Sequence, residues 1–477
     1  MRVLVTGATG YIGGRLLPLL LARGHRVRAL VRDPDRAAGA PWSSDVDVVA
    51  GDVLEPASLG SALDGVDLAY YLIHSMGAGG DFAERDRRAA ASFAAAARAA
   101  SCHVVYLGGL VPAGEVLSKH LASRAEVGAV LREGCDATEL RAGPVIGSGS
   151  ASFEMVRYLT ERLPLMVAPR WIRNPVQPIA VDDVLSYLLE AGEGRPGGTI
   201  DVGADVLTFR SMMEVYAEVR GLRRIILPVP VLAPGLAARW VGLVTPIPNR
   251  LAVPLIEGVL QPVIADTSRA RRLYPHVEPL PYREAVRRAL DETVSGAVIT
   301  RWSDALGRPG PRALEEREGL VREVRAADVA APPEVVYRVF SGLGADRGWP
   351  AWSWAWRLRG LLDRLAGGPG LRRGRRHPDE LRVGEAVDFW RAELVQPPER
   401  LRLRAEMRLP GRAWLQWDAR GQGEGTRLVQ TAYFAPRGLP GLLYWYGLYP
   451  AHAVIFGGLV RAIARRAERL AGEEDRL

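Results

Sequence analysis

Residues 1–13 read MRVLVTGATGYIG, and this stretch decides the fold of the first half of the chain. A short apolar run, residues 3–5, stops at a glycine-rich turn, and an apolar-periodic segment follows with Leu16, Leu17, Leu20 and Leu21. A strand, a glycine turn and a helix in this order are typical of a dinucleotide-binding fold. The open alternative is a glycine-rich turn in another parallel α/β domain.

Each glycine of the stretch has its own expected role. Gly7 permits the tight turn, Gly10 leaves room for a pyrophosphate, and Gly13 lets the helix pack close to the strand. The N-terminus of the helix offers N–H groups and a positive dipole to the phosphates. We therefore expect the cofactor-binding residues of this segment to be Thr6, Gly7, Thr9, Gly10, Tyr11, Ile12 and Gly13.

Length and composition predict a globular protein of more than one domain. The chain has 477 residues, which is too long for one ordinary core, with 48% hydrophobic and 24% charged residues. The net charge of +8 comes almost entirely from arginine, since Lys119 is the only lysine. This preference for arginine over lysine indicates a coding preference and not a nucleic-acid-binding surface. We therefore expect no nucleic-acid partner. The dense basic stretch at 372–377 lacks interleaved aromatics and is typical of a solvated loop, with a patch for an anionic partner as the alternative.

The cysteine content and the apolar runs of the sequence predict the cellular compartment of the protein. Two cysteines, Cys102 and Cys135, exclude a disulfide scaffold and suit a reducing compartment. The nucleotide motif begins at once, so we expect no signal peptide. No uninterrupted apolar stretch reaches the ~20 residues of a membrane span; the longest approximation, residues 251–265, contains Glu257, Gln261 and two prolines. We expect a cytoplasmic protein without a transmembrane segment.

The first half alternates strand and helix patterns. We expect helices at 82–100 and 121–132, and strands at 26–31, 47–50, 68–73, 103–107 and 138–141. Such alternation predicts an α/β doubly wound parallel sheet of the Rossmann type. Pro18 interrupts the first helical pattern, but Gly14 lies four residues before it and eases the crowding, so we keep the helix.

Two further segments bear on the choice of cofactor. Arg32 closes the second strand, where an arginine suits the extra phosphate of NADP and an acidic residue the ribose hydroxyl of NAD. NADP(H) is therefore favoured, while the neighbouring Asp33 keeps NAD(H) open unless it only initiates the turn before Pro34. Asp52 and Val53 follow the third strand and are candidates to contact the adenine; the alternative is a plain Gly-Asp turn.

These motifs together resemble the short-chain dehydrogenase/reductase superfamily in its extended and atypical branches. The resemblance covers roughly residues 1–295 and rests on residues 6–13, 31–34, 51–53, 140–144 and 177–184. It implies a Rossmann domain at 1–300 in which residues 145–295 mix the last sheet elements with a substrate lobe.

The catalytic signature of that superfamily is missing. Its members use Tyr-x-x-x-Lys on the helix after the fifth strand, but position 115, four residues before the only lysine, is Glu115. Alignment with the family's helix places His120 at the tyrosine position and Arg124 at the lysine position, with Gly108 and Gly109 near the usual serine. Residues four apart share a helix face, so His120 and Arg124 are candidate catalytic residues. The alternative is that the cofactor is kept only as a structural or sensing ligand.

Three other polar positions are weaker candidates. His74 ends the fourth strand, where such sheets place residues that face the cofactor, although a plain loop histidine is an equal alternative. Asp182 and Asp183 are adjacent carboxylates, for which helix capping is the favoured interpretation. We expect no metal site.

The last third of the chain predicts a different domain. Residues 301–319 turn to Pro, Gly and charge and are expected to be a linker. Residues 320–477 follow with an α+β pattern: a strand at 320–324, a helix at 333–340, a long helix from about 450 to 471, and strands at 386–394, 401–409, 413–419 and 426–435. This order resembles the START and polyketide-cyclase superfamily, the helix-grip fold, on residues 331–337, 425–432 and 438–446.

The resemblance implies an apolar ligand held between the sheet and the long helix. Aromatic surface gathers in this region at Trp349, Trp352, Trp354, Trp356, Trp390, Trp414, Trp417 and Trp445. Such residues form a core or line a hydrophobic-ligand cavity. His452 near the last helix is expected to be structural.

Taken together, the sequence predicts an NAD(P)H-binding protein and favours an oxidoreductase that acts on a bulky hydrophobic carbonyl or quinone-like compound. The alternative is a non-catalytic NADP(H)-sensing or scaffold protein, as the resemblance to NmrA-like regulators and to the Rossmann accessory subunit of respiratory complex I implies. A hydrophobic small molecule is the expected partner, and homo-oligomer formation stays open.

Overall fold

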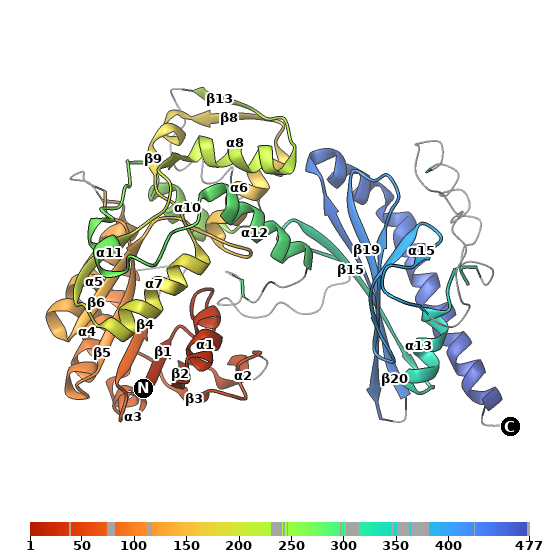
Figure 1. Cartoon of the computed structure of the whole chain (residues 1–477), viewed down its shortest axis with the longest axis horizontal. Helices are drawn as coiled ribbons and strands as arrows, with labels where there is room; N and C mark the ends of the chain where they lie inside the picture. Colours follow the sequence, from red (N-terminus) through yellow and green to blue (C-terminus); the bar gives the residue numbers. More distant parts are fainter. Residues whose placement is uncertain are drawn as a thin grey trace. The chain divides into compact units, whose positions relative to one another are not determined.

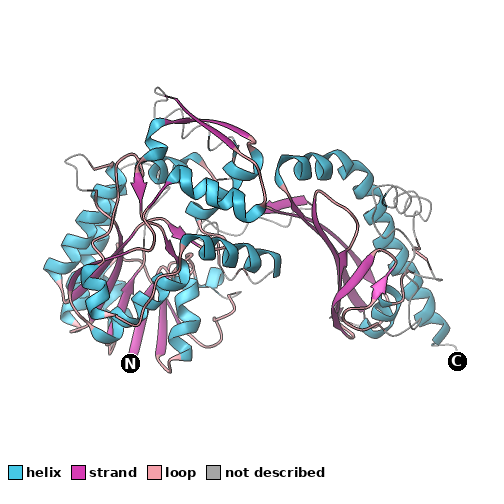
Figure 2. Ribbon diagram, turned by 45° about the horizontal axis from the view of Figure 1, so that its top comes forward, coloured by secondary structure: helices cyan, strands magenta, loops and turns pink. Residues whose placement is uncertain are grey.

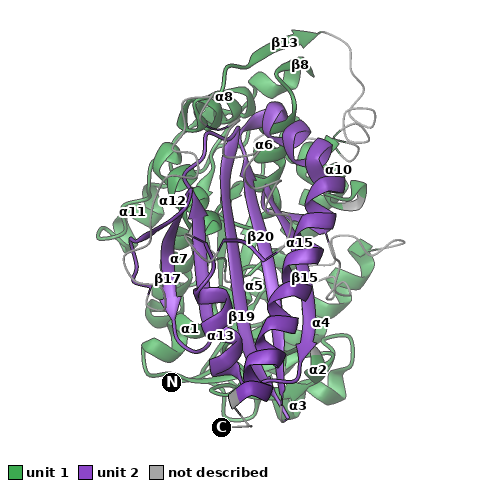
Figure 3. Ribbon diagram, turned by 90° about the vertical axis from the view of Figure 1, so that its right-hand side faces the viewer, with its two compact units in different colours: residues 1–309 green, residues 310–477 purple. Residues whose placement is uncertain are grey.

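The chain forms two compact units, residues 1–309 and 310–477, which Figure 3 colours separately. The structure is a computed structural model. It describes residues 1–37, 40–73, 82–112, 117–229, 241, 244–245, 247–295, 298, 300–301, 314–344, 348–350, 363, 381–423 and 425–474.

The first unit is built on a seven-stranded parallel sheet in the order β11-β6-β5-β4-β1-β2-β3. Its strands are β1 (Arg2–Thr6), β2 (Arg26–Val31), β3 (Asp47–Ala50), β4 (Leu68–Tyr71), β5 (His103–Gly109), β6 (Ala137–Ala142) and β11 (Gly198–Val202). β1 pairs with β2 on one side and with β4 on the other, so the strand order reverses there. Ligands of such sheets bind outside the carboxyl ends of the strands at this reversal. The predicted doubly wound sheet is confirmed.

Helices cover both faces of this sheet, as Figure 2 shows. They include α1 (Gly13–Ala22), α2 (Pro34–Ala37), α3 (Pro56–Leu63), α4 (Phe82–Ala99), α5 (Lys119–Gly134) and α7 (Val181–Gly194). Side chains alternate along β1: Val3 and Val5 pack in the core with Leu16 of α1, whereas Leu4 packs in the opposite core with Phe93 of α4. α1 continues through Pro18, as expected.

A lobe with its own apolar core follows β6. Its helices are α6 (Ala151–Arg162), α8 (Phe209–Arg220), α10 (Asn249–Glu257) and α12 (Tyr282–Ser295). α11 (Ser268–Leu273) packs instead against β11 of the parallel sheet, with Ala270 in that core. Short strands pair as β7 (Val145–Ile146) with β10 (Ile179–Ala180), β9 (Pro175–Val176) with β12 (Leu207–Thr208), and β8 (Leu165–Pro169) with β13 (Ile225–Val229). Phe153, Met212 and Ile256 are buried in this core and bring α6, α8 and α10 together.

The second unit is an antiparallel sheet packed against a long C-terminal helix (Figure 1). The strands are β14 (Leu314–Arg317), β15 (Leu320–Val329), β16 (Ala386–Val387), β17 (Trp390–Gln396), β18 (Arg400–Ala405), β19 (Gly411–Gln422) and β20 (Gly425–Pro436), in the order β14-β15-β20-β19-β18-β17-β16. The helices are α13 (Pro333–Ser341) and α15 (Gly438–Glu474).

Several boundaries of this unit differ from the sequence-based prediction; the strand predicted at 320–324, for example, continues to Val329 as β15. β14 lies within 301–319, the range predicted to be linker, because its charged residues pair with β15 and need no apolar run. One predicted strand, 386–394, is two strands, with Asp388 at a positive φ of 54° in the turn. α15 begins at Gly438, well before residue 450, and continues through Pro450. Buried Leu442 and Trp445 anchor its first turns in the core, and this packing outweighs the hydrogen bond lost at the proline.

Four tryptophans of the predicted aromatic surface belong to the core of the second unit: Trp349, Trp390, Trp417 and Trp445. Trp414 is buried as well but lies outside that core. Trp417 Nε1 donates a hydrogen bond to Gln430 Oε1 at 2.9 Å, and Trp349 Nε1 donates to Asp388 Oδ2 at 2.8 Å. Trp352, Trp354 and Trp356 lie outside the described residues. The rings of Trp445 and Phe456 flank His452, which gives this histidine a packing role.

One helix of the described chain is long and apolar enough to cross a membrane, judged by length and composition alone. It is residues 438–473 of α15, whose most apolar window has a mean hydropathy of 1.3 and is 33% buried. Leu459, Val460 and Ile463 of the same helix are buried in the core of the unit. A core helix of this kind passes the same test, so the expected absence of a transmembrane segment stays a prediction.

Candidate cofactor and substrate site

Two glycines of the opening turn are required by its geometry. Gly7 has a φ of 67°, and a Cβ there would lie 2.6 Å from the Leu72 carbonyl oxygen. A Cβ on Gly13 would lie 2.3 Å from the Gly7 carbonyl oxygen. The amide of Gly10 closes the turn by donating to that same oxygen at 2.9 Å. The turn therefore folds back on the start of α1 and holds it close to β1.

The turn opens onto a cavity of about 380 Å³ at the carboxyl ends of the central strands. Gly7, Gly10, Tyr11, Ile12 and Gly13 line one side of it. The first N–H groups of a helix can bind an anion. The amides of Gly14 and Arg15 already donate to carbonyls of the turn, so donors for an anion come from the amides that precede Gly14. A glycine turn without side chains and a helix N-terminus at one wall fit the pyrophosphate of a dinucleotide.

Thr6 and Thr9, also predicted to bind the cofactor, are not among the described residues that line this cavity. The Thr6 hydroxyl donates to the Tyr70 carbonyl at 3.1 Å and accepts from the Leu72 amide at 3.1 Å. It therefore joins β1 to the end of β4 and shapes the turn from behind. Thr9 is half-buried within the turn.

The Tyr11 side chain packs away from solvent beside the turn. Its hydroxyl is buried and has no hydrogen-bond partner in the described part of the chain, and burial raises the pKa of the phenol well above 10. A Cβ on Gly147 would lie 2.5 Å from this hydroxyl oxygen, so glycine at 147 makes the space for it. The Tyr11 carbonyl accepts a hydrogen bond from Thr300 Oγ1 at 2.7 Å.

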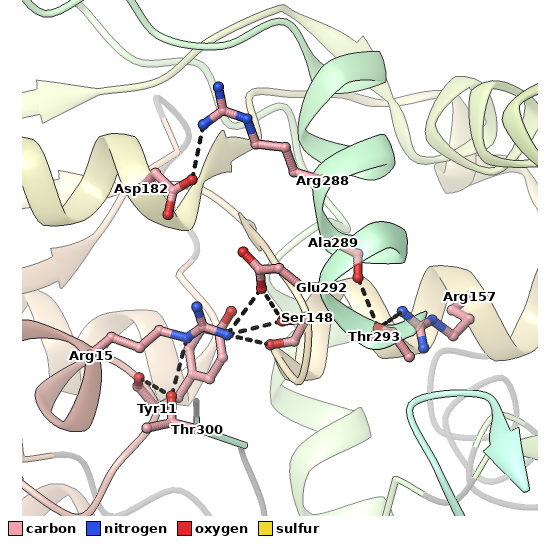
Figure 4. Close-up of polar contacts among 10 residues, drawn as sticks. All are labelled: Tyr11, Arg15, Ser148, Arg157, Asp182, Arg288, Ala289, Glu292, Thr293 and Thr300. Atoms are coloured by element: carbon pink, nitrogen blue, oxygen red, sulfur yellow. Dashed lines mark hydrogen bonds and ion pairs between the residues drawn. The ribbon is translucent and has the colours of Figure 1, made fainter. Parts of the chain in front are cut away.

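A buried arginine fixes the first helix behind the turn (Figure 4). Arg15 Nη2 lies 3.0 Å from both the carbonyl and the hydroxyl oxygen of Ser148, and 3.5 Å from the Glu292 carboxylate. Its Nε donates to Thr300 Oγ1 at 3.2 Å, and its guanidinium lies 5.1 Å from the Tyr11 ring centroid. These contacts join α1 to α12 and to the loop after β7. These contacts cannot be predicted from local sequence, because the partners are far apart along the chain.

The residues predicted to contact the ribose and the adenine lie on neighbouring segments, but their side chains have different surroundings. Arg32 directly follows β2 and is exposed. The Gly51 amide donates to the Val31 carbonyl at 2.9 Å, which brings the Asp52 segment next to it. Asp52 Oδ1 accepts from the Leu54 amide at 3.0 Å, and Val53 is buried in the core, so both shape the turn. Asp33 Oδ1 accepts from the Asp35 amide at 3.1 Å, which is the turn-initiating role considered for it.

His120 and Arg124 lie one turn apart on α5, and both line the cavity that Gly10 lines. The Ser118 hydroxyl, which accepts from the Leu121 amide at 3.2 Å, caps this helix just before His120. Arg124 Nη2 donates to the Leu107 carbonyl at the end of β5, and its guanidinium lies 5.8 Å from the Tyr106 ring centroid. Arg124 Nε is buried without an acceptor among the described residues.

Two glycines of β5, Gly108 and Gly109, line the cavity beside this arginine. A Cβ on Gly109 would lie 3.5 Å from Arg124 Nε, an ordinary van der Waals distance, so the arginine itself does not require glycine at this position. The alignment that placed His120 and Arg124 at the missing tyrosine and lysine thus leads to two side chains at one cavity. Whether they act in catalysis stays a prediction.

The remaining sequence candidates have other surroundings. His74 lies outside the described residues. The capping role expected for the two aspartates is wrong, since Ala180 precedes α7 without a side-chain cap. Instead, Asp182 pairs with Arg288 at 3.1 Å, and Asp183 Oδ2 accepts from the Leu280 amide at 2.8 Å. In the described chain, no group of three or more His, Cys, Asp or Glu side chains is placed to hold a metal ion.

Both cysteines lie in surroundings that favour the neutral thiol. Cys102 is buried and Cys135 half-buried, and both are free. Burial raises the pKa of Cys102 to about 12 and that of Cys135 to about 11. Nucleophilic and metal-binding cysteines have a lowered pKa, so cysteine chemistry is not a feature of this unit.

The far wall of the cavity is apolar and comes from the lobe. It is formed by α6, α8, α10 and the segments beside them, with Met155, Val176, Phe209, Met212, Leu251, Leu255, Val259 and Val263. Sequence reasoning missed these residues, whose only signal was apolar spacing that a core helix shares. The cavity thus combines a polar edge with His120 and Arg124 and a wall suited to a hydrophobic compound.

Two families match the two units. The family described as NAD(P)H-binding matches residues 7–140, and DUF2867, a family of proteins of unknown function, matches residues 318–459.

Curated relatives match short segments of the chain. Sterol demethylase protein B of Methylococcus capsulatus is 41% identical over 71 residues, which are 15% of this chain and 21% of the relative. A 3 beta-hydroxysteroid dehydrogenase/Delta 5-->4-isomerase of Mycobacterium tuberculosis is 37% identical over 70 residues, 15% of this chain and 18% of the relative. A 3-diazoavenalumate denitrifying reductase of Streptomyces is 51% identical over 63 residues, 13% and 19% of the two chains. The chain thus matches about a fifth of the length of these relatives.

Solved structures resemble the first unit at low identity. The crystal structure of gox2253 has a TM-score of 0.47 and 21% identity, covering 64% of this chain and 99% of that one. The NAD complex of Thermus thermophilus UDP-glucose 4-epimerase has a TM-score of 0.45 and 20% identity, covering 61% and 98%. By the family matches, residues 7–140 of the first unit are similar to NAD(P)H-binding domains and residues 318–459 of the second unit to DUF2867 domains.

Proposed function

We propose that the chain is an NADP(H)-dependent oxidoreductase that acts on a bulky hydrophobic carbonyl or quinone-like compound. The observation that carries this proposal is the shared cavity. Gly10 lines it at one side, His120 and Arg124 at the edge, and an apolar wall closes it. This combination supports a site for a redox cofactor, a proton donor and a hydrophobic substrate.

Backbone amides of the glycine turn and the positive charge of Arg32 would bind the cofactor. Gly10, Tyr11, Ile12 and Gly13 present the turn and the first amide of α1 to the pyrophosphate. The exposed guanidinium of Arg32 at the end of β2 suits the phosphate that distinguishes NADP from NAD. When bound, the nicotinamide supplies or accepts the hydride.

The chain's own residues would manage the proton and the developing charge. The His120 imidazole transfers a proton to or from the substrate oxygen, because a histidine changes charge near neutral pH. The buried Arg124 Nε, a donor without an acceptor among the described residues, stabilises negative charge at that oxygen or holds the ribose. This pair would replace the tyrosine and lysine of the superfamily.

The relatives support the reaction class and the substrate class. Two of them are named as a dehydrogenase and a reductase, and two are named for a sterol or hydroxysteroid. Steroids are large apolar compounds, which agrees with the apolar wall formed by Phe209, Met212 and Leu255.

A second candidate function is a non-catalytic NADP(H)-sensing or scaffold protein. The observation in its favour is that Arg124 already contacts the Leu107 carbonyl and the Tyr106 ring and so stabilises α5 on β5. In this case the second unit, with a helix-grip arrangement, would bind the hydrophobic ligand and report cofactor occupancy.

Turnover separates the two functions. Purified protein would be titrated with NADPH by calorimetry and then assayed for NADPH consumption with hydrophobic ketones, enones and quinones. Consumption that falls in His120→Phe but not in Lys119→Ala, its exposed neighbour, supports the enzyme. Tight binding of NADPH without turnover of any compound supports the sensor.

A further inference from the structure

A second apolar pocket, of about 500 Å³, adjoins the first within the lobe. Met155 and Phe209 line both, so these two side chains form a shared wall. The second pocket extends from this wall to β8, where Met166 and Ala168 line it, and to Met213 of α8.

The chemistry of this second pocket is nearly uniform. Its described lining residues are all hydrophobic, and none carries a charge. The one polar group among their side chains is the Trp171 indole, whose Nε1 is buried and has no acceptor in the described part of the chain. A buried indole N–H ordinarily has a hydrogen-bond acceptor. A ligand with an acceptor within reach of Nε1 would supply the missing one.

Exposed apolar side chains stand beside the pocket as well. Leu165 and Val167 of β8 are among its lining residues and are 54% and 50% exposed, and their neighbours in the ladder, Ile225 and Leu227, are 60% and 49% exposed. The strand pair next to the pocket is therefore apolar on its exposed side too. Protein interiors leave few voids larger than a water molecule, and pockets of 300–1,000 Å³ with such walls are typical of ligand sites.

We propose that the second pocket holds the apolar end of an elongated ligand with one hydrogen-bond acceptor, which takes the Trp171 N–H. The other end of the ligand lies beyond Met155 and Phe209, in the cavity with His120. That the far end is the reacting one rests on the proposed function; that the second pocket binds an apolar ligand does not.

The test measures binding without cofactor or turnover. The probes are acetylpyrene and ethylpyrene, which have nearly the same size and differ in one carbonyl acceptor, measured by equilibrium dialysis with fluorescence detection. We expect both to bind the full-length wild-type chain, and saturating NADPH not to displace them.

Two neighbouring methionines of α8 provide a matched pair. Met213 lines only the second pocket and Met212 only the first. Met213→Trp should weaken both probes by about tenfold or more by filling the pocket, whereas Met212→Trp should leave their affinity unchanged. If Met213→Trp does not fold, as judged by circular dichroism, Ala168→Leu replaces it.

Trp171→Phe isolates the hydrogen bond. It should weaken acetylpyrene by about fivefold, the effect of one neutral hydrogen bond, and leave ethylpyrene unchanged. The proposal is overturned if Met213→Trp leaves the affinity for the probes unchanged. It is also overturned if Met212→Trp lowers that affinity as much as Met213→Trp does. If the wild-type chain binds NADPH but neither probe, the proposal for the second pocket is rejected and the cofactor assignment stands. If it binds the probes but not NADPH, only the cofactor assignment is rejected.

Discussion

Gly10→Asp should abolish NADPH binding while leaving the protein folded. A Cβ on Gly10 would meet one atom within 4 Å, the Gly7 carbonyl oxygen at 3.1 Å, so a small shift accommodates it. Beyond the Cβ, the side chain enters the cavity where the pyrophosphate is expected. Two unit charges about 4 Å apart at an effective dielectric constant of about 20 repel by about 4 kcal/mol. We therefore expect the affinity to fall by about three orders of magnitude.

Two further substitutions separate charge from size. Gly10→Asn has nearly the same shape without the charge and should retain a measurable part of the affinity, while Gly10→Ala reports the Cβ alone. Calorimetric titration with NADPH at low and moderate salt is the assay, since salt weakens only the charge term. Circular dichroism and thermal melting check the fold. Wild-type affinity in a folded Gly10→Asp protein would refute the cofactor site.

Three other outcomes follow from the same structure. Arg32→Ala should weaken NADPH by roughly 1.5–3 kcal/mol more than NADH, and calorimetry showing equal losses would mean that Arg32 does not read the extra phosphate. His120→Phe should lower turnover by about a hundredfold with little change in NADPH affinity, whereas the exposed Lys119→Ala should change neither; equal rates in both variants would contradict the catalytic role. Burial raises the pKa of Asp183, so its stabilising contribution is complete below the ordinary value near 4 and is lost as the pH rises through the raised one. Asp183→Asn should remove that dependence from urea unfolding measured across this range.

The fold of the first unit was predictable because its signals are local. Val3, Leu4 and Val5 are all buried, and alternate side chains pack on opposite faces, as expected for a strand covered on both sides. The turn that follows depends on Gly7 and Gly13, whose missing side chains can be read directly from the sequence. Strand, turn and helix all lie within one short segment, so no distant contact was needed to predict them.

The boundaries of the second unit were less predictable because packing overrides local signals there. Pro450 predicts a helix boundary, yet α15 continues through it from Gly438. Trp445 lies in the core and stacks on Phe434 of β20 with ring centroids 5.1 Å apart. That contact depends on the position of β20, which the sequence around the helix does not reveal.

The candidate site was predictable on its polar side only. His120 and Arg124 were predicted because they align with the catalytic tyrosine and lysine positions of the short-chain dehydrogenase/reductase superfamily. Both line the cavity with Gly10. Its apolar wall combines Met155, Phe209 and Leu255 from three helices that are distant in sequence. Apolar residues that line a cavity and apolar residues that fill a core have the same composition and spacing, so periodicity cannot separate them.

The two pockets of the first unit share a feature that connects stability with function. The residues that line each of them include buried donors without an acceptor among the described residues: Arg124 Nε and the Tyr11 hydroxyl in the first, and Trp171 Nε1 in the second. Leaving such a group unpaired costs about 1–3 kcal/mol, a cost that a ligand with an acceptor in the right place removes. Core substitutions that merely fill space would leave these donors unpaired. The chemistry that completes these pockets is therefore apolar bulk together with an acceptor for each donor.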